Sequence, residues 1–231
     1  MTTRRHDNPA LVLVAHGTRS ARGVEMIAAL AEAVSKKVGE TRVAFVDVLG
    51  PSPEEVLTDL GRPAVVVPAF LASGYHVHHD VHGAASQFSD AVVTPALGPD
   101  PVLAEVLRER LVEAGWRPGD AVVLAAAGSS DARALADVRC AAAMLATTIN
   151  QRVRIGYVAT GTPTVTDSVA AARADGAHRV FVASYLLAHG LFHERLFNAG
   201  ADGVAQPLGV HPKIVDLVAS RHDRAAVLAG L

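Results

Sequence analysis

The chain contains two copies of one sequence pattern. Four matched pairs of segments occur in the same order and at a nearly constant offset. They are LVLVAHGTR (11–19) with VVLAAAGSS (122–130), VAFVDVLGP (43–51) with IGYVATGTP (155–163), VVVPAFLASG (65–74) with VFVASYLLAHG (180–190), and ALGPDP (96–101) with PLGVHP (207–212). The repeat predicts two similar domains, 1–116 and 117–231, each near the usual size of a single domain. Both copies must keep a core, but a reaction needs only one set of reactive side chains. Function is therefore to be sought where the copies differ.

Within each copy, short Val-rich runs alternate with longer, Ala-rich and charged segments. Strands are expected at 11–15, 42–48, 64–70, 91–94, 121–126, 153–159, 179–185 and 204–206, and helices at 21–38, 53–60, 100–114, 131–149, 164–175 and 212–220. Continuously apolar strands that alternate with helices are typical of a parallel sheet covered on both faces. We therefore expect two α/β domains, joined by a linker at 115–120, GWRPGD.

Composition limits the classes of function. Half of the residues are hydrophobic, and the net charge is -2 with no basic stripe, which argues against nucleic acid as a partner. The single cysteine, Cys140, excludes an internal disulfide and a multi-cysteine metal site. The N-terminus lacks the apolar segment of a secretory signal, and no uncharged apolar run is long enough to span a membrane. We expect a soluble, cytoplasmic protein.

Two polar residues end apolar runs in the first copy. His16 follows the first strand in AHGTR, and Asp47 ends the second in AFVDVLGP. Ligands of parallel sheets bind at the carboxyl ends of the strands, so both residues are candidates for chemistry. Each also has a structural alternative. His16 would hydrogen-bond to nearby backbone, and Asp47 would cap the helix after Pro51.

A histidine cluster follows the third strand. Residues 74–82 read GYHVHHDVH and contain four histidines, His76, His78, His79 and His82. Imidazole is a common ligand of transition metals and titrates near neutral pH. A solvated polar loop is the alternative, but this density of histidines favours metal binding or proton transfer by at least one of them.

The second copy lacks most of this constellation. Ala127 stands in place of His16, and Ala159 in place of Asp47. The loop LLAHGLFHERL retains His189 and His193, which we interpret either as remnants of a site or as substrate contacts. The chain has no GxxxxGK[ST], no GxGxxG after a strand, no HExxH and no GxSxG, so nucleotide-driven chemistry is not indicated.

Taken together, the motifs AHGTR, a carboxylate before a proline, and GYHVHHD after FLASG resemble the class II tetrapyrrole chelatases of the sirohydrochlorin chelatase family. The resemblance spans nearly the whole chain and matches the duplicated, two-domain form of the family. It implies a chelatase-like fold that binds the tetrapyrrole in a cleft between the halves and uses no nucleotide.

The resemblance also implies roles for particular residues. The two metal-handling histidines of the family fall on His16 and His76. Its acidic residue, usually glutamate, falls on Asp47, whose side chain is one methylene shorter. Sirohydrochlorin carries eight carboxylates, so basic residues at the rim are candidate substrate contacts. They are Arg19, His78, His79, His189, His193 and Arg195, with ordinary solvated arginines as the alternative for Arg19 and Arg195.

The resulting hypothesis is an enzyme that inserts a divalent metal, Fe²⁺ in the first instance, into sirohydrochlorin to give siroheme. The metal is a substrate and no organic cofactor is expected. Insertion of cobalt for cobalamin synthesis is the first alternative, because both ions accept imidazole and carboxylate ligands. A non-catalytic carrier of metal or tetrapyrrole is the second. We expect a monomer that interacts with no nucleic acid and no membrane.

Overall fold

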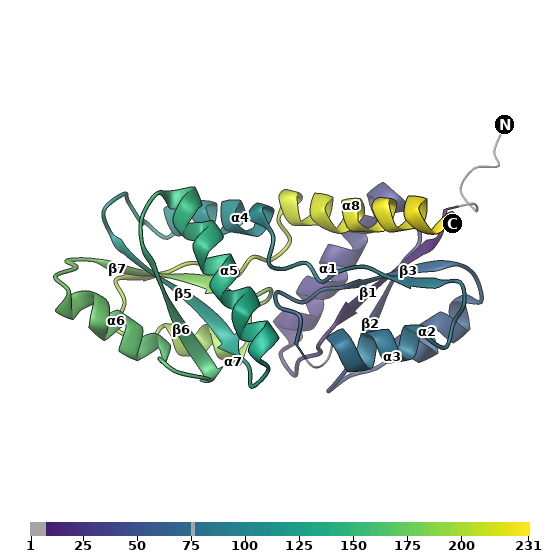
Figure 1. The fold of residues 1–231 in the computed structure, drawn as a ribbon, viewed down its shortest axis with the longest axis horizontal. Helices are drawn as coiled ribbons and strands as arrows, with labels where there is room; N and C mark the ends of the chain where they lie inside the picture. Colours follow the sequence, from purple (N-terminus) through teal and green to yellow (C-terminus); the bar gives the residue numbers. More distant parts are fainter. Residues whose placement is uncertain (1–7, 75–76) are drawn as a thin grey trace. The chain divides into compact units, whose positions relative to one another are not determined.

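The structure is a computed structural model that describes residues 8–74 and 77–231, and of His78 only the backbone. The chain forms two compact units. The first comprises the chain up to Leu97 together with Pro212–Leu231, and the second comprises Gly98–His211. Each unit holds a four-stranded parallel sheet with helices around it, which confirms the expected α/β fold (Figure 1).

The sheet of the first unit has the strand order β2-β1-β3-β4. Its strands are β1 (Ala10–Ala15), β2 (Thr41–Phe45), β3 (Ala64–Pro68) and β4 (Ala91–Val93). All residues of β1 and β3 are buried, because helices cover both faces of these central strands. The continuous apolar runs of the sequence are therefore the two strands in the middle of the sheet.

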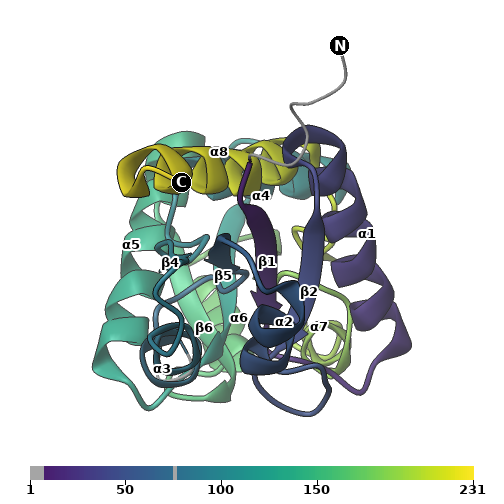
Figure 2. The same cartoon turned by 90° about the vertical axis from the view of Figure 1, so that its right-hand side faces the viewer.

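Two pairs of helices cover this sheet. The helices α1 (Ala21–Val38) and α8 (Pro212–Ala229) contact each other and one face, and α2 (Pro53–Leu60) and α3 (His82–Ala85) pack together on the other (Figure 2). Helix α2 begins with a capping box, in which Ser52 Oγ accepts a hydrogen bond from Glu55 N and Glu55 Oε2 accepts one from Ser52 N.

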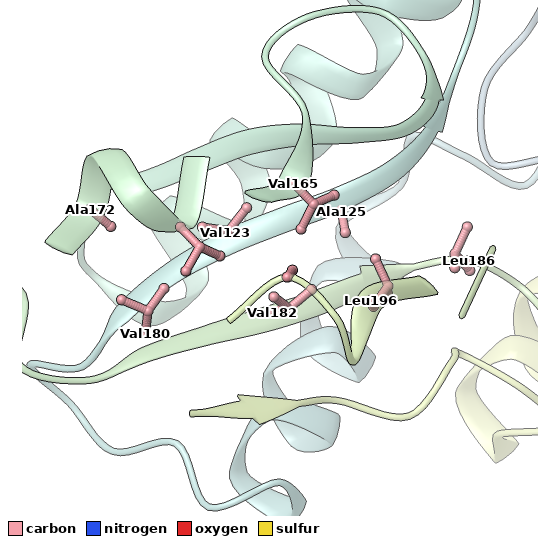
Figure 3. Close-up of a cluster of buried hydrophobic side chains, with 10 residues drawn as sticks. Val123, Ala125, Val165, Ala172, Val180, Val182, Leu186 and Leu196 are labelled. Atoms are coloured by element: carbon pink, nitrogen blue, oxygen red, sulfur yellow. The ribbon is translucent and has the colours of Figure 1, made fainter. Parts of the chain in front are cut away.

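The second unit repeats this plan with the strand order β6-β5-β7-β8. Its elements are α4 (Pro101–Glu113), β5 (Ala121–Gly128), α5 (Ala132–Ile149), β6 (Val153–Thr160), α6 (Val165–Ala174), β7 (Val180–Tyr185), α7 (Leu191–Leu196) and β8 (Gly203–Val204). Valines of β5 and β7 pack against α6 and α7 in a buried apolar cluster (Figure 3). Thr164 and Asp167 form the same capping box at α6 as Ser52 and Glu55 form at α2.

The compact units differ from the expected halves by an exchange of one helix each. The last helix of the first repeat, α4, packs on β7 and α5 of the second unit, and the last helix of the second repeat, α8, packs on β3, β4 and α1 of the first unit. The repeats at 1–116 and 117–231 therefore describe the sequence, while the packing units divide at 97/98 and 211/212. The segment 115–120, expected to be the linker, lies inside the second unit between α4 and β5.

Helical structure extends further than the sequence patterns predicted. Part of the histidine-rich segment that follows the third strand forms a π-helix, η1 (Val77–Val81), that continues into α3. Val77, Val81 and Ala85 are buried at a helical spacing of four, and this burial stabilises the helix. Residues 191–196, expected as a loop, form α7, and α8 continues to Ala229 rather than ending near 220.

Candidate functional site

The carboxyl ends of three strands bring the candidate residues to one edge of the first sheet. Ala15 is the register partner of Phe45, and Val14 is the partner of Pro68, so β1, β2 and β3 end at nearly the same level. His16 follows β1 directly, and Asp47 follows β2 after one residue. The strand-end rule thus placed both residues on the same edge.

The backbones of His16 and Asp47 are hydrogen-bonded to each other. Asp47 N donates to His16 O at 2.9 Å. This approach requires Gly17, which has a φ of +100°, because a Cβ at this position would lie 2.0 Å from Asp47 O. The close contact fixes the separation of the two polar residues through the main chain, so their relative position does not depend on flexible side-chain contacts.

Both side chains are accessible to a ligand. His16 is exposed, and its ring centroid lies 6.4 Å from that of Phe70, which follows β3, with the planes inclined by 53°. Asp47 is also exposed, and its Oδ1 accepts a hydrogen bond from Val48 N at 2.7 Å. The cap of α2 is Ser52, so the alternative role of Asp47 as a helix cap does not apply.

The histidine cluster begins immediately after this edge. His76 and the side chain of His78 lie outside the described residues, so their predicted roles stay predictions. His79 and His82 are exposed, while Val77 and Val81 anchor the segment in the core. Within the part of the chain that the structure describes, no three His, Cys, Asp or Glu side chains come together as a metal site. The predicted metal pair of His16 and His76, with Asp47 beside it, remains a prediction.

The second repeat presents a different edge. Ala127 lies within β5 and Ala159 within β6, so neither supplies a metal ligand or a base there. His189 is half-buried, and its ring packs edge-on against His193 at a centroid distance of 5.0 Å. Arg195 is exposed on α7, as Arg19 is after β1. Substrate contacts by His189, Arg195 and Arg19 stay predictions.

His193 has a structural function that the sequence did not reveal. It is buried, its Nε2 donates to Ala205 O at 3.1 Å, and its ring packs against Phe197. Burial lowers the pKa of His193, an effect that the bond to Ala205 O partly opposes. The neutral ring therefore ties α7 to the segment after β8, and the substrate contact predicted for His193 stays a prediction.

A hollow of about 340 Å³ in the second unit lies away from the candidate site. It is lined by the first residues of β5, by Arg152 and Arg154 at the start of β6, and by the end of α6, including Asp175, which pairs with Arg154. These residues mark the amino edge of the sheet, opposite the carboxyl ends of the strands. In parallel sheets that edge is not where ligands usually bind.

Sequence reasoning missed two residues near His16 and Asp47. Phe70 packs beside the imidazole of His16, and its position after β3 in PAFLASG was the available signal. Val48, next to Asp47, has a φ of 67°, a backbone conformation rare for a β-branched residue. Nothing in the sequence DVLGP indicates that conformation, because valine strongly favours extended backbone.

Comparison with known proteins gives consistent matches. A sequence model described as CbiX matches residues 10–114 and again 121–225. A sirohydrochlorin cobaltochelatase of Methanothermobacter thermautotrophicus is 29% identical over an alignment that covers 45% of this chain and 91% of the relative. The resemblance and the duplication found in the sequence are confirmed by these matches.

Solved structures show the same fold. SirB from Bacillus subtilis with Fe³⁺ aligns with a TM-score of 0.79 at 22% identity and covers 96% of this chain and 98% of its own. CbiX, described as the terminal enzyme for biosynthesis of siroheme in denitrifying bacteria, aligns with a TM-score of 0.69 at 23% identity, over 94% of this chain and 99% of its own.

Proposed function

The chain belongs to the CbiX family, and we propose that it is a sirohydrochlorin chelatase that inserts Fe²⁺ into sirohydrochlorin to give siroheme. The observation that carries the proposal is the joining of His16 and Asp47, backbone to backbone, at the carboxyl edge of the first sheet. The second repeat has Ala127 and Ala159 at the matching positions, so it retains the fold without these groups.

The chemistry needs groups that hold a divalent ion, release it and accept protons. Insertion removes two pyrrole protons from the free-base macrocycle. Neutral imidazole binds such an ion and accepts protons near neutral pH, so His16 and His76 are proposed as the metal ligands and proton acceptors. Asp47 supplies negative charge beside His16, and its Oδ1 is oriented by the bond from Val48 N. The main-chain contact between the two loops keeps His16 and Asp47 in place during the reaction.

The carboxylates of the substrate need positive or hydrogen-bonding partners. Arg19, His78, His79, His189, His193 and Arg195 were expected to supply them. For the two arginines and for His78, His79 and His189, the proposal is a direct contact. For His193, which is buried, it is support of α7 from within.

Insertion of cobalt is the second candidate. It is favoured by the relative from Methanothermobacter thermautotrophicus, which is named a sirohydrochlorin cobaltochelatase. Imidazole and carboxylate ligands do not separate ferrous from cobaltous ions strongly, so the donor set proposed here serves both. A carrier function is the third candidate, and it differs from an enzyme in that it binds its cargo without turnover.

The remaining proposals concern the setting of the enzyme. Among the described residues, no helix is both long and apolar enough to cross a membrane. We propose a cytoplasmic monomer that works without an organic cofactor and without nucleic acid. Size-exclusion chromatography with light scattering would test the monomer directly.

The decisive assay is anaerobic metal insertion by purified protein. Sirohydrochlorin is supplied with Fe²⁺ or with Co²⁺, and the absorbance of the metallated product is followed against a protein-free reaction. A chelatase produces many equivalents of product per protein and prefers one ion. Product limited to one equivalent would identify a carrier, and rates equal to the protein-free reaction with both ions would refute the proposal.

A further inference from the structure

The turn beside Asp47 contains a residue in a strained backbone conformation. Val48 has a φ of 67°, and Leu49 N donates to Asp47 O across it at 2.7 Å, which closes a tight γ-turn. For a β-branched residue the left-handed region is sterically costly. Among the described residues other than glycine, Asn150 alone shares a positive φ, and asparagine tolerates this conformation at the end of α5.

The second repeat makes the corresponding connection with no positive φ at a β-branched residue. In its matching segment, ATGTP, Thr160 aligns with Val48, and the positive φ falls one position later, at Gly161, which has no side chain to strain. The fold therefore does not require a β-branched residue in a left-handed conformation after the second strand of a repeat. The strain is confined to the repeat that carries Asp47.

Burial in the core does not compensate the strain. Val48 is 47% exposed and Leu49 is 38% exposed, so both apolar side chains face solvent. Backbone strain of this kind clusters at active sites and at loops that hold ligands. The two side chains flank Asp47, whose backbone N is bonded to His16 O.

The turn lies beside the two residues that are proposed to handle the metal, and this position indicates what its apolar side chains would contact. If His16 and Asp47 deliver a metal to the centre of a macrocycle, the surface that surrounds them must meet the apolar faces of the pyrrole rings. We propose that Val48 and Leu49 form an apolar contact for the face of the tetrapyrrole and help to determine its affinity. This inference rests on the proposed function and adds two substrate-binding residues to it.

The experiment measures binding of metal-free sirohydrochlorin, by its fluorescence, and the melting temperature of each variant. Val48→Asn relieves the strain and removes the apolar contact, so we expect a higher melting temperature and binding about five- to tenfold weaker. Val48→Ile keeps both features and should bind at least as tightly as the wild type. Val112→Asn is the matched control, because Val112 is 53% exposed near the end of α4 that leads to the amino edge of the second sheet.

Several outcomes would overturn the inference. They are unchanged affinity of Val48→Asn, an equal loss of affinity in Val112→Asn, and a lower melting temperature of Val48→Asn, which would refute the strain. If the wild type binds sirohydrochlorin and turns it over while Val48→Asn binds normally, only this inference fails. If the wild type neither binds nor metallates sirohydrochlorin, the proposed function fails with it.

Discussion

Replacing Gly17 with alanine tests whether the main-chain contact between His16 and Asp47 matters for insertion. A Cβ at Gly17 would lie 2.0 Å from Asp47 O, so the two loops must separate. Alanine at positive φ costs about 1–2 kcal/mol, and loss of the hydrogen bond from Asp47 N to His16 O adds about 1 kcal/mol. We therefore expect Gly17→Ala to lower the free energy of unfolding by about 2–3 kcal/mol.

Two other glycines separate the effects. Gly39 has a φ of +96° and open space around its Cβ position, so Gly39→Ala reports the conformational cost alone, about 1–2 kcal/mol. Gly128 is the counterpart of Gly17 in the second repeat, where a Cβ would lie 1.8 Å from Thr160 O. Gly128→Ala should therefore destabilise the protein about as much as Gly17→Ala, and it provides a control of equal steric severity.

The variants should differ in activity. A displacement of about 1 Å between reacting groups costs about 100-fold in rate, so Gly17→Ala should lower the insertion rate by that order. Gly128→Ala should keep the rate per folded molecule within about threefold of the wild type. Urea unfolding gives the free energies, and initial rates of metal insertion at a temperature where every variant is folded give the activity. Equal losses of rate in both variants, or no loss in Gly17→Ala, would refute the reasoning.

Three further predictions concern the stability of the protein and the role of the second repeat. Because the pKa of His193 is lowered in the folded protein, the stability that its neutral ring contributes is present above its unfolded pKa of about 6.5 and is lost as the pH falls through the folded value. His193→Gln should flatten the acid side of a plot of unfolding free energy against pH, and an unchanged slope would contradict this assignment. His222 is fully buried, and its ring nitrogens lie 2.9 Å from Asp223 Oδ1 and from Pro9 O. His222→Ala should therefore lower the free energy of unfolding, measured in urea, by about 2–4 kcal/mol. A loss below about 1 kcal/mol would count against a stabilising role of this side chain. Ala127→His should leave the insertion rate and the number of bound metal ions, measured by equilibrium dialysis, at wild-type values, because the matching carboxylate is missing; a second bound ion would disprove this.

The sequence predicted those parts of the fold that depend on local pattern. Strands such as β1 and β3 are continuous apolar runs, and the ends of β1 and β2 located His16 and Asp47 at one edge of the sheet. Val77 and Val81 are four residues apart, a spacing that indicates a helix, but the density of histidines in this segment favoured interpretation as a loop.

Other features depend on tertiary structure and have no local signature. The helices α4 and α8 occupy matching places in the two repeats, so the sequence alone does not say that each packs on the sheet of the other repeat. The bond from His193 to Ala205 O joins α7 to the segment that follows β8. The positive φ of Val48 opposes the intrinsic preference of valine and is imposed by the surrounding turn.

The central claim is that the first repeat carries the chemistry, and single-turnover metal insertion into saturating sirohydrochlorin tests it most directly. His16→Ala removes an exposed side chain and should leave the fold intact. His189→Ala is the comparison in the second repeat. The account predicts that His16→Ala lowers the insertion rate by about 100-fold or more, while His189→Ala weakens sirohydrochlorin binding and keeps the rate at saturation. A rate for His16→Ala within about threefold of the wild type, or an equal loss in His189→Ala at saturation, would contradict it.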